Sequence, residues 1–489
     1  MASRNTHLPQ ESTERRTPNA ERHYKTFWVM GITLAGMGLS LLVRVLLIPK
    51  RFGFSDTADA LTTALTVVLL VDTIVREGAK FSLVPVFVSN EKEMTRTEYQ
   101  RFTNSLLMLL LSIGFGIFIL IEVFAPWIVS RLLSKSTVDV LKTTTLLRFC
   151  APLLIFGCGS TVLGAFLNSQ QRFKTVALRN ALPAGTAAFI FLMLWNTQTL
   201  ENWVAMAYTG GFIAYFAWLC IGVYRTGHRY AFTGVSGDTL RDLKNTVTLP
   251  TLGFGIRQIV NRLLVEVYLV SQLGSGAITL YKSAFQIFSA LQTLIGISIA
   301  TTGLPDMARI AVSSQQSAIS KEQCVAGEND SSCHNDLPTV SDNRRFPTAS
   351  NRMELGRTLN RNARTAIIIG FPVTLILLVF HGRISWLLYG RGTIDQTSIE
   401  LIGQLLFWLS SGMIFSCLIP VLNAGLYAQK AYRAVFTNMV TMAILNFLLA
   451  YGLMETWWLL SVALSVSITA LLAVGNLTYL LRRTRVSWF

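Results

Sequence analysis

Long apolar segments recur along almost the whole of this chain, and they constrain its fold more than any other feature. Hydrophobic residues make up 52% of the 489 residues, whereas charged residues make up only 14%. Soluble proteins carry about a quarter charged residues. A helix of about 20 apolar residues crosses the roughly 30 Å hydrocarbon core of a bilayer. The sequence therefore predicts an all-α polytopic membrane protein of about 12 transmembrane helices.

The predicted spans are separated by polar loops, most of which are short. They cover approximately residues 27–48, 56–88, 102–124, 144–167, 175–195, 203–224, 246–271, 276–303, 363–380, 399–427, 432–453 and 457–481. Residues 1–26 are polar and lack the apolar core and cleavage site of a signal peptide. We therefore expect them to form a disordered cytoplasmic tail.

The loops between the spans differ in charge. Lys and Arg gather in the tail, in the loops after spans 2, 4, 6, 8 and 10, and at the C-terminus, whereas the loops after spans 5, 7 and 11 have none. Positively charged loops stay in the cytoplasm, so both termini are predicted to be cytoplasmic. The same loops account for the net charge of +16. No basic helix or aromatic-interleaved motif favours nucleic-acid binding.

Two parts of the sequence repeat one another. Leu146–Gln170 and Leu405–Gln429 share ten of 25 positions at a constant offset of 259 residues. Val84-Pro85 at the end of span 2 matches Leu304-Pro305 at the end of span 8, at an offset of 220. An even number of spans separates the equivalent segments, which predicts two six-helix lobes in parallel repeat.

The repeat also defines the expected domains. The lobes are predicted at 27–225 and 246–485, and residues 226–245 are expected to form a cytoplasmic linker. The two offsets differ by 39 residues, and this excess falls in a polar stretch at 306–361. Its Ser, Asn, Asp and Arg content predicts a flexible cytoplasmic insertion without a core of its own.

Charged residues inside the spans concentrate in spans 1, 2, 7 and 8. A charge at mid-bilayer costs roughly 3 kcal/mol, so such residues usually face a protein interior or an aqueous cavity. We therefore expect these four spans to line a central cavity. The cations of this set are Arg44, Arg76, Lys80, Arg257, Arg262 and Lys282, and the anions are Asp59, Asp72, Glu77 and Glu266. Outside it, Arg148 and Arg179 are expected at the membrane interface. The net positive lining suits phosphate or carboxylate groups, which guanidinium binds with forked hydrogen bonds.

Some of these residues also have a purely structural interpretation. Arg44 lies close to the end of span 1 and is able to snorkel to the interface. Arg262 and Glu266 are one helical turn apart and are able to form a structural ion pair. Asp59 is near the start of span 2, where a carboxylate can cap the helix.

Four motifs carry a family resemblance. They read R-F-G-F-S-D-T-A-D-A (51–60), R-E-G-A-K-F-S-L-V-P-V-F (76–87), L-G-A-F-L-N-S-Q-Q-R-F (163–173) and L-L-Y-G-R-G (387–392). They resemble the MurJ/MviN family of lipid II flippases, within the multidrug/oligosaccharidyl-lipid/polysaccharide exporter superfamily. The resemblance extends over all the predicted spans. It implies a two-lobed fold with a cavity lined by spans 1, 2, 7 and 8, in agreement with the distribution of charge.

The resemblance also assigns individual residues. Arg44 matches a cavity arginine of the family, Asp59 its cavity aspartate, and Glu77 the glutamate of its E-G-A motif. The sequence departs from the family pattern at Gly38, at Asp72 with Thr73, and near Gln286, where the family has arginines. Many family members also carry two further C-terminal spans that help to form a lipid-tail groove, and this sequence ends before them.

The resemblance and the cation-rich lining together predict a flippase. It is expected to move lipid II across the bacterial cytoplasmic (inner) membrane by alternating access, for cell-wall synthesis. The expected substrate-binding residues are Arg44, Asp59, Arg76, Glu77, Arg257, Arg262 and Lys282. Asp59 and Glu266 are expected to couple transport to a cation or to the membrane potential. No cofactor or metal is expected, and the expected partners are the lipid-linked glycan pyrophosphate, membrane lipids and the cell-wall synthesis machinery.

Other functions remain open at this point. The cargo is alternatively another polyprenyl-linked oligosaccharide, or a small molecule as in MATE exporters, although a positive lining disfavours cationic drugs. A membrane prenyltransferase using D-T-A-D at 56–59 needs a second Asp-rich motif for magnesium, and the sequence has none. We therefore do not expect an enzyme. A scaffold that recruits partners through 306–361 is the remaining alternative.

Overall fold

The computed structural model describes most of the chain. The described residues are 31–133, 138–170, 172–231, 251–300, 303, 307, 349–390, 394–429 and 431–483, and the side chains of 78–82, 84–86, 88–93 and 349–352 are excepted. The expected tail at 1–26, most of the linker at 226–245 and residues 308–348 of the expected insertion lie outside them. Every regular element of the described residues is helical.

The first lobe contains six hydrophobic helical spans, in which η denotes a π-helical segment. They are residues 31–52, which include η1 (Leu42–Leu47) and α2 (Ile48–Phe52); α3 (Asp56–Glu93); α4 (Arg96–Leu132); α5 (Val140–Cys150) with α6 (Leu153–Ser169); α7 (Phe173–Ala177) with α8 (Ala181–Met193); and α9 (Leu200–Tyr224).

The second lobe repeats this order. Its spans are residues 251–271, which include η2 (Val260–Leu269); α11 (Ala277–Gln292) with η3 (Thr293–Ile297); α13 (Ala349–Tyr389); α14 (Gln396–Ser411) with α15 (Met413–Ala428); α16 (Tyr432–Gly452); and α18 (Leu460–Arg483), which follows the short α17 (Met454–Trp457).

These helices account for every predicted span. Among the described residues, ten helices are long and apolar enough to cross a membrane, and the pair α14–α15 with its bend of 44° makes an eleventh. The remaining span, residues 251–271, is a helix that carries Arg257, Arg262 and Glu266. The polytopic all-α fold is therefore confirmed.

The start of α13 corrects the expected insertion at 306–361. This helix begins at Ala349, within the stretch that composition predicted to be flexible. Leu355 and Leu359 are buried in a hydrophobic cluster together with Leu422 of α15 and Leu477 of α18. Residues 349–361 therefore belong to a packed helix, because their leucines recur at helical spacing and find partners in the second lobe.

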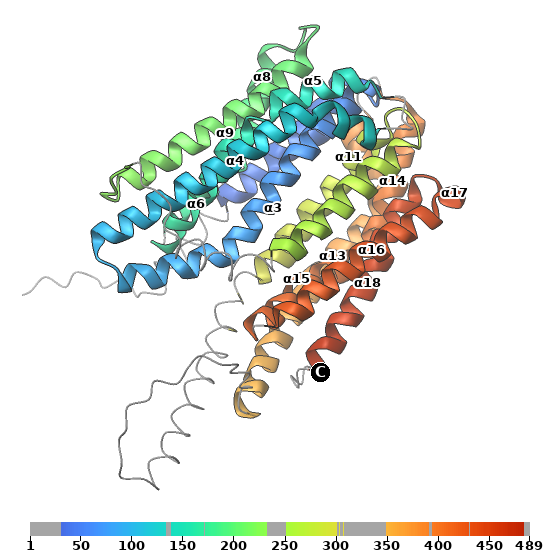
Figure 1. Cartoon of the computed structure of the whole chain (residues 1–489). Helices are drawn as coiled ribbons and strands as arrows, with labels where there is room; N and C mark the ends of the chain where they lie inside the picture. The colour runs from blue at the N-terminus through green and yellow to red at the C-terminus, as the bar shows by residue number, and fades with distance from the viewer. Residues whose placement is uncertain are drawn as a thin grey trace, which may run out of the picture.

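The internal repeat is visible in the packing. The contacts of α4 with α6 and of α8 with α9 recur in the second lobe as α13 with α15 and α16 with α18. Spans 4 and 10 are both interrupted near equivalent residues, since α5 ends at Cys150 and α14 ends at Ser411. Figure 1 shows two elongated bundles that meet near α5, α11 and α14 and diverge toward the C-terminus.

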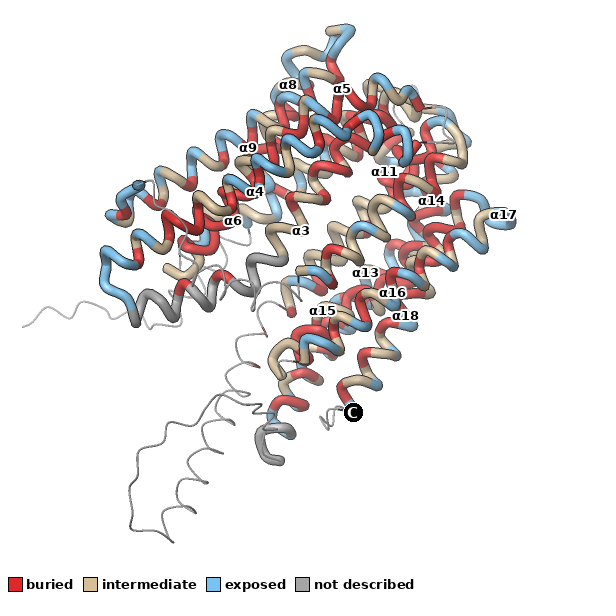
Figure 2. Tube along the Cα trace, in the orientation of Figure 1, coloured by how far each residue is buried: buried red, intermediate tan, exposed pale blue. Residues whose placement is uncertain are grey.

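Hydrophobic burial follows this arrangement. One cluster contains buried residues of both lobes, among them Val43, Leu61, Val267 and Tyr281. A second cluster contains buried residues of the second lobe only, and a third contains buried residues of the first lobe only. Buried positions accordingly run along the interior of each bundle, while outward positions of α4 and α13 are exposed (Figure 2). The lobes therefore share a core where they meet and keep separate cores beyond it.

Side chains at the loop ends explain where several helices begin. Thr95 and Glu98 form a capping box at the start of α4, in which Thr95 Oγ1 accepts from the Glu98 N–H at 3.4 Å. Asp395 caps α14 by accepting from the Ser398 N–H at 3.0 Å. By contrast, the residue that precedes α11 is Gly276, which has a φ of 79° and no side chain to cap the helix. Its cap comes from the other lobe.

Candidate binding cavity and inter-lobe latch

Asp59 of α3 forms hydrogen bonds from the first lobe to the second. Its Oδ1 atom accepts hydrogen bonds from Thr279 of α11, at 2.8 Å from the backbone N–H and at 2.6 Å from the hydroxyl. Asp59 is fully buried, and Thr279 is 1% exposed. The carboxylate thus caps the N-terminus of α11, where the helix dipole favours negative charge. We call this contact the latch.

The latch corrects the expected position of Asp59. The sequence placed this residue in a cavity wall as a substrate-binding and coupling group, or as a cap of its own helix. In the structure it caps a helix of the opposite lobe, and it lines neither of the two cavities described next. The sequence could not foresee this, because the partner is a backbone N–H more than 200 residues away.

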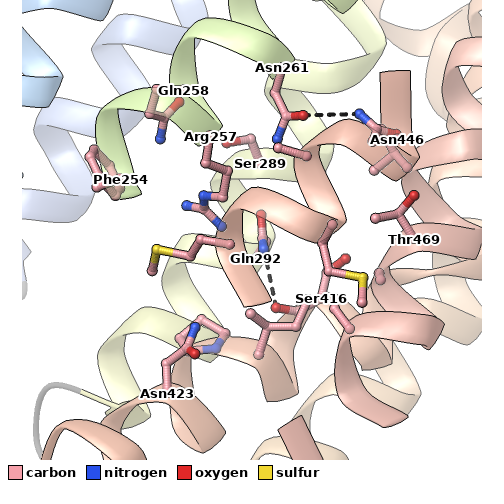
Figure 3. A pocket seen from close by; sticks show the side chains of 18 of the residues that line it. Phe254, Arg257, Gln258, Asn261, Ser289, Gln292, Ser416, Asn423, Asn446 and Thr469 are labelled. Carbon is pink, nitrogen blue, oxygen red and sulfur yellow. Dashed lines mark hydrogen bonds between the residues drawn. The ribbon is translucent and has the colours of Figure 1, made fainter. Parts of the chain in front are cut away.

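The larger cavity has a volume of about 400 Å³ and belongs mainly to the second lobe. It lies between residues 251–271, α11, α15, α16 and α18, and Glu77 is its one lining residue from the first lobe. Its polar lining includes Arg257, Gln258, Asn261, Arg262, Glu266, Ser289, Gln292, Ser416, Asn423, Asn438, Asn446 and Thr469. Figure 3 shows many of these side chains converging on one space from several helices. The volume is in the range of small-molecule sites.

A second, much smaller pocket lies between the lobes beside the latch. Its volume is about 20 Å³, which is room for about one water molecule. Its lining comes from η1, α3 and α11 and consists of Arg44, Ile48, Thr62, Leu65, Thr66, Thr279, Lys282 and Gln286. Spans 1, 2 and 8 therefore meet as predicted, but around a small pocket, while the larger cavity also recruits α15, α16 and α18.

An ion-pair triad separates the two cavities. Glu266 Oε2 pairs with Lys282 Nζ, and Glu266 Oε1 lies 3.8 Å from Arg262 Nε. The side chains of Glu266 and Lys282 are 4% and 6% exposed. Glu266 lines the larger cavity, whereas Lys282 lines the smaller pocket. The structural pair of Arg262 with Glu266 considered from the sequence is thus present, with Lys282 as a second cation that one helix could not reveal.

Two cations face the cavities without a carboxylate partner among the described residues. Arg257 stacks over Phe254 at 5.5 Å, and its Nε atom is buried with no hydrogen-bond partner in that part of the chain. Arg44 stacks over Tyr208 at 5.7 Å, and its Nε lies 3.5 Å from the Tyr208 hydroxyl. Arg44 therefore points into the protein rather than snorkelling to the interface. These two guanidinium groups are the ones best placed to meet an anion.

Asp72 and Arg179 occupy positions that the sequence did not predict. Asp72 was expected in the central cavity and Arg179 at the interface. Instead Arg179 Nη2 contacts Asp72 Oδ1 at 2.5 Å inside the first lobe, with side chains only 12% and 6% exposed. The guanidinium also lies against Phe212 and Tyr215, at 5.7 and 5.8 Å from the ring centres. The pair is a structural element of the first lobe, formed because each charge needs a partner in an apolar interior.

Further along α3, Arg76 and Glu77 pair with one another. Arg76 Nη1 lies 2.8 Å from Glu77 Oε1, and the side chains are 33% and 22% exposed. Glu77 also reaches the larger cavity. The side chain of Lys80 lies outside the described residues. Arg76 therefore contributes less free positive charge than its position in the sequence suggested.

The sequence analysis considered only charged residues and therefore missed the uncharged polar residues that line the larger cavity. Asn423, Asn446 and Thr469 are 6%, 4% and 9% exposed, and each has a side-chain oxygen without a hydrogen-bond partner among the described residues. Carboxamides within otherwise apolar spans are costly in lipid, so they indicate an internal polar surface. Asn residues within apolar spans were therefore the sequence signal that could have revealed this part of the lining.

The family model described as "Lipid II flippase MurJ" matches residues 48–329 and 331–488 of this chain. The chain belongs to the MurJ family. The chain is also similar in sequence to curated relatives named "Probable lipid II flippase MurJ". That of Thermotoga maritima is 21% identical over 432 residues, which cover 88% of this chain and 79% of the relative. That of Rickettsia prowazekii is 21% identical over 446 residues, which cover 89% of this chain and 79% of the relative.

Solved structures share the fold. A structure titled "Lipid II flippase MurJ, inward closed conformation" superposes with a TM-score of 0.72 at 17% identity, covering 95% of this chain and 87% of that chain. An inward-facing MATE family transporter of the MOP superfamily has a TM-score of 0.67 at 13% identity, with 94% of each chain covered. The two-lobed architecture of this MurJ-family chain is therefore common to flippases and to multidrug exporters.

Proposed function

We propose that this MurJ-family protein translocates lipid II, a polyprenyl-pyrophosphate-linked glycan precursor, from the inner to the outer leaflet of the bacterial inner membrane. The single observation that carries the proposal is the position of Arg257 and Arg44, two guanidinium groups free of carboxylate partners among the described residues, beside cavities of a MurJ-family fold. Guanidinium binds pyrophosphate oxygens in a forked geometry. The two cavities together are lined by four cations (Arg44, Arg257, Arg262 and Lys282) and two carboxylates (Glu77 and Glu266), and this excess of positive charge favours that cargo over cationic drugs.

The arrangement of the lobes supports an inward-facing state. With both termini in the cytoplasm, as the loop charges predict, the diverging end of the two bundles faces the side on which the precursor is made (Figure 1). The latch lies at the opposite end, near the start of α3 and α11. Rocking of the lobes about this end is the motion expected of an internally repeated transporter.

The polar lining suits both the pyrophosphate and the glycan-peptide part of such a cargo. Arg257 and Arg262 are proposed to attract the pyrophosphate from the larger cavity, and Arg44 and Lys282 to hold it at the small pocket. Carboxamides such as Asn423 and Asn446 bring donors and acceptors suited to sugar hydroxyl, acetamido and peptide groups. The prenyl chain is proposed to remain in lipid. In this account the protein carries its cargo without chemical change, so it is not an enzyme.

Opening to the outer side requires the latch to break. We infer that loss of negative charge at Asp59, by a proton or a competing cation, weakens its hold on α11 and favours opening. Glu266 is the second carboxylate through which a cation or the membrane potential would act. Contact with cell-wall synthesis proteins is proposed as the route by which translocated precursor is used.

Translocation of fluorescent lipid II by purified protein in proteoliposomes tests the function. We expect wild-type protein to transport it and Arg44→Ala combined with Arg262→Ala to lose most of the rate. Complementation of a strain depleted of its lipid II flippase tests the cargo in cells. Rescue of a different lipid-linked oligosaccharide pathway, without transport of lipid II, would move the protein to the alternative cargo.

A further inference from the structure

Glu266 has a position between two cations that a coupling role alone does not explain. Its two carboxylate oxygens face Lys282 and Arg262, and it is the one acidic group of the triad. On one side of the Glu266–Lys282 pair lies the larger cavity, and on the other lies the small pocket that contains Thr279 of the latch. The pair is therefore a partition between the space that an anionic group would enter and the pocket beside the latch.

We propose that Glu266 is an internal counter-ion that occupies the anion position on Lys282 until a phosphate group of the cargo displaces it. The proposal rests on the proposed function, because it assigns a role in recognising the pyrophosphate of the same cargo. It makes Glu266 a specificity-determining residue rather than a binding one: the carboxylate sets how strongly an incoming anion must interact with Lys282.

The need for such a group follows from burial. The side chain of Lys282 is only 6% exposed, and a buried ammonium without a partner is strongly unfavourable. Glu266 satisfies it while no cargo is present. A phosphate group brings more negative charge and more acceptor oxygens than a carboxylate, so it is able to replace Glu266 at Lys282. Because that replacement joins the small pocket to the larger cavity, the phosphate then has room to reach Arg44 as well.

The displaced carboxylate also has a second partner at hand. Glu266 Oε1 already lies 3.8 Å from Arg262 Nε, which is too long for a strong hydrogen bond and leaves room for a closer contact. Arg262 is 33% exposed and stacks over Phe285 at 5.6 Å, so its guanidinium remains near the cavity. Glu266 can therefore shift toward Arg262 when Lys282 takes the phosphate. No buried charge is left unpaired by the exchange.

The exchange connects cargo binding to the latch. Removal of the partition joins the larger cavity to the small pocket, and the anion then lies beside Thr279, whose hydroxyl and N–H are the donors to Asp59. A phosphate oxygen in this pocket competes with Asp59 for those donors. The internal carboxylate also keeps the anion site from binding too tightly, which a transporter needs in order to release its cargo.

The test measures binding of farnesyl pyrophosphate to purified full-length protein in nanodiscs, with farnesol as the uncharged probe. Glu266→Gln is expected to bind farnesyl pyrophosphate about tenfold more tightly than wild type, because the competing carboxylate is gone. Lys282→Gln is expected to bind it about tenfold more weakly. Neither variant should change farnesol binding. In proteoliposomes, Glu266→Gln should move lipid II more slowly because release is delayed.

Glu201→Gln is the matched control. Glu201 is another largely buried carboxylate in an ion pair: it lies 2.8 Å from Lys142 Nζ, its side chain is 9% exposed and that of Lys142 is 33% exposed, and it lines neither cavity. Its neutralisation should leave pyrophosphate binding unchanged. If Glu266→Gln folds poorly, Glu266→Asp keeps the charge on a shorter side chain and should show a smaller gain in affinity. The double variant Glu266→Gln/Lys282→Gln removes both charges and should lose that gain.

The outcomes separate the two proposals. Unchanged or weaker pyrophosphate binding by folded Glu266→Gln and Glu266→Asp, together with lipid II transport by the wild type, overturns the counter-ion role and leaves the flippase intact. An equal gain in Glu201→Gln also overturns it, because the effect would then follow from net charge alone. Failure of the wild type to move lipid II overturns the proposed function itself.

Discussion

Asp59 and Thr279 are hydrogen-bonded to one another and are separated by 220 residues, which is the offset of the internal repeat between spans 2 and 8. Equivalent positions of two lobes related by an axis along the membrane normal can touch only where they approach that axis. The latch therefore lies on the pseudo-symmetry axis. One half supplies a carboxylate there, and the other supplies the donors of a helix N-terminus.

Asp59→Asn should loosen the latch. The amide oxygen still accepts a hydrogen bond, but the charge that interacts with the N-terminus of α11 is lost, at a cost of about 1 kcal/mol. Spin labels at the exposed positions Leu141 and Gln396, one near the junction end of each lobe, should report a larger population of long distances. Asp139→Asn likewise keeps an accepting oxygen and removes only the charge of a cap within one lobe, that of α5, so it should leave the distance distribution unchanged. Equal broadening in both variants would contradict the latch.

Gly276→Ala should disturb the same junction. Gly276 has a φ of 79°, and a Cβ atom there would meet the carbonyl oxygen of Phe54 in the other lobe. Gly274 has a φ of 122° but nothing within 4 Å of such an atom, so Gly274→Ala carries backbone strain without the clash. We expect both variants to lower thermal stability and only Gly276→Ala to increase the distance between the lobes. Identical distances in the two variants would show that the close approach does not matter.

Arg257→Gln should reduce lipid II translocation about tenfold or more, because a guanidinium aimed at the cavity is replaced by a neutral amide. Arg148→Gln is the control. Arg148 lies 3.4 Å from Glu122 on the outer surface of the first lobe, and the two side chains are 46% and 41% exposed. Initial rates in proteoliposomes with equal protein content make the comparison. Full activity of Arg257→Gln would remove this residue from the binding site.

Arg179→Ala should destabilise the first lobe by roughly 3 to 5 kcal/mol, since it leaves the buried carboxylate of Asp72 without a counter-charge. The double variant Asp72→Asn/Arg179→Gln should recover part of this loss because no unpaired charge remains. Thermal unfolding in detergent, followed by intrinsic fluorescence, measures both. A double variant as unstable as Arg179→Ala would show that packing against Phe212, rather than charge, dominates.

Protein stability should fall as the pH drops below about 6.5, the ordinary pKa of histidine. His228, beyond the end of α9, is 3% exposed, and burial lowers the pKa of its imidazole. Its Nε2 atom lies 3.0 Å from Asn104 Oδ1. The folded state therefore binds this proton less readily than the unfolded state, so stability is complete above the unfolded pKa and is lost below it. Midpoints of thermal unfolding at pH 8 and pH 5.5 should differ less in His228→Gln than in wild type.

Much of this architecture could be predicted from the sequence. The spans, the repeat and the cations of spans 1, 7 and 8 follow from hydropathy, from the matching of spans 4 and 10, and from the cost of charge in lipid. Arg44, Arg257 and Lys282 indeed lie beside the two cavities. Such properties belong to single helices or to their order along the chain, so one sequence is enough to reveal them.

The remainder depends on which helices touch. A carboxylate within an apolar span indicates only that it needs a partner, so Asp59 and Asp72 could not be told apart in the sequence. In the structure, Asp59 caps a helix of the second lobe, whereas Asp72 pairs with Arg179 inside the first. The start of α13 was missed for a different reason. The polar composition of this stretch predicted a flexible segment, although the spacing of Leu355 and Leu359 already indicated one buried helical face.

The three hydrophobic clusters determine which contacts oppose a rotation of one lobe against the other. Because one cluster is confined to each lobe, a rotation of one bundle against the other leaves both of those interiors intact. Among the residues that the structure describes, the shared cluster and the polar contacts beside it are what such a rotation must remake. The end at which the lobes pivot is therefore also the end that carries the latch. Small chemical changes at this junction are enough to set the rate of the whole transport cycle.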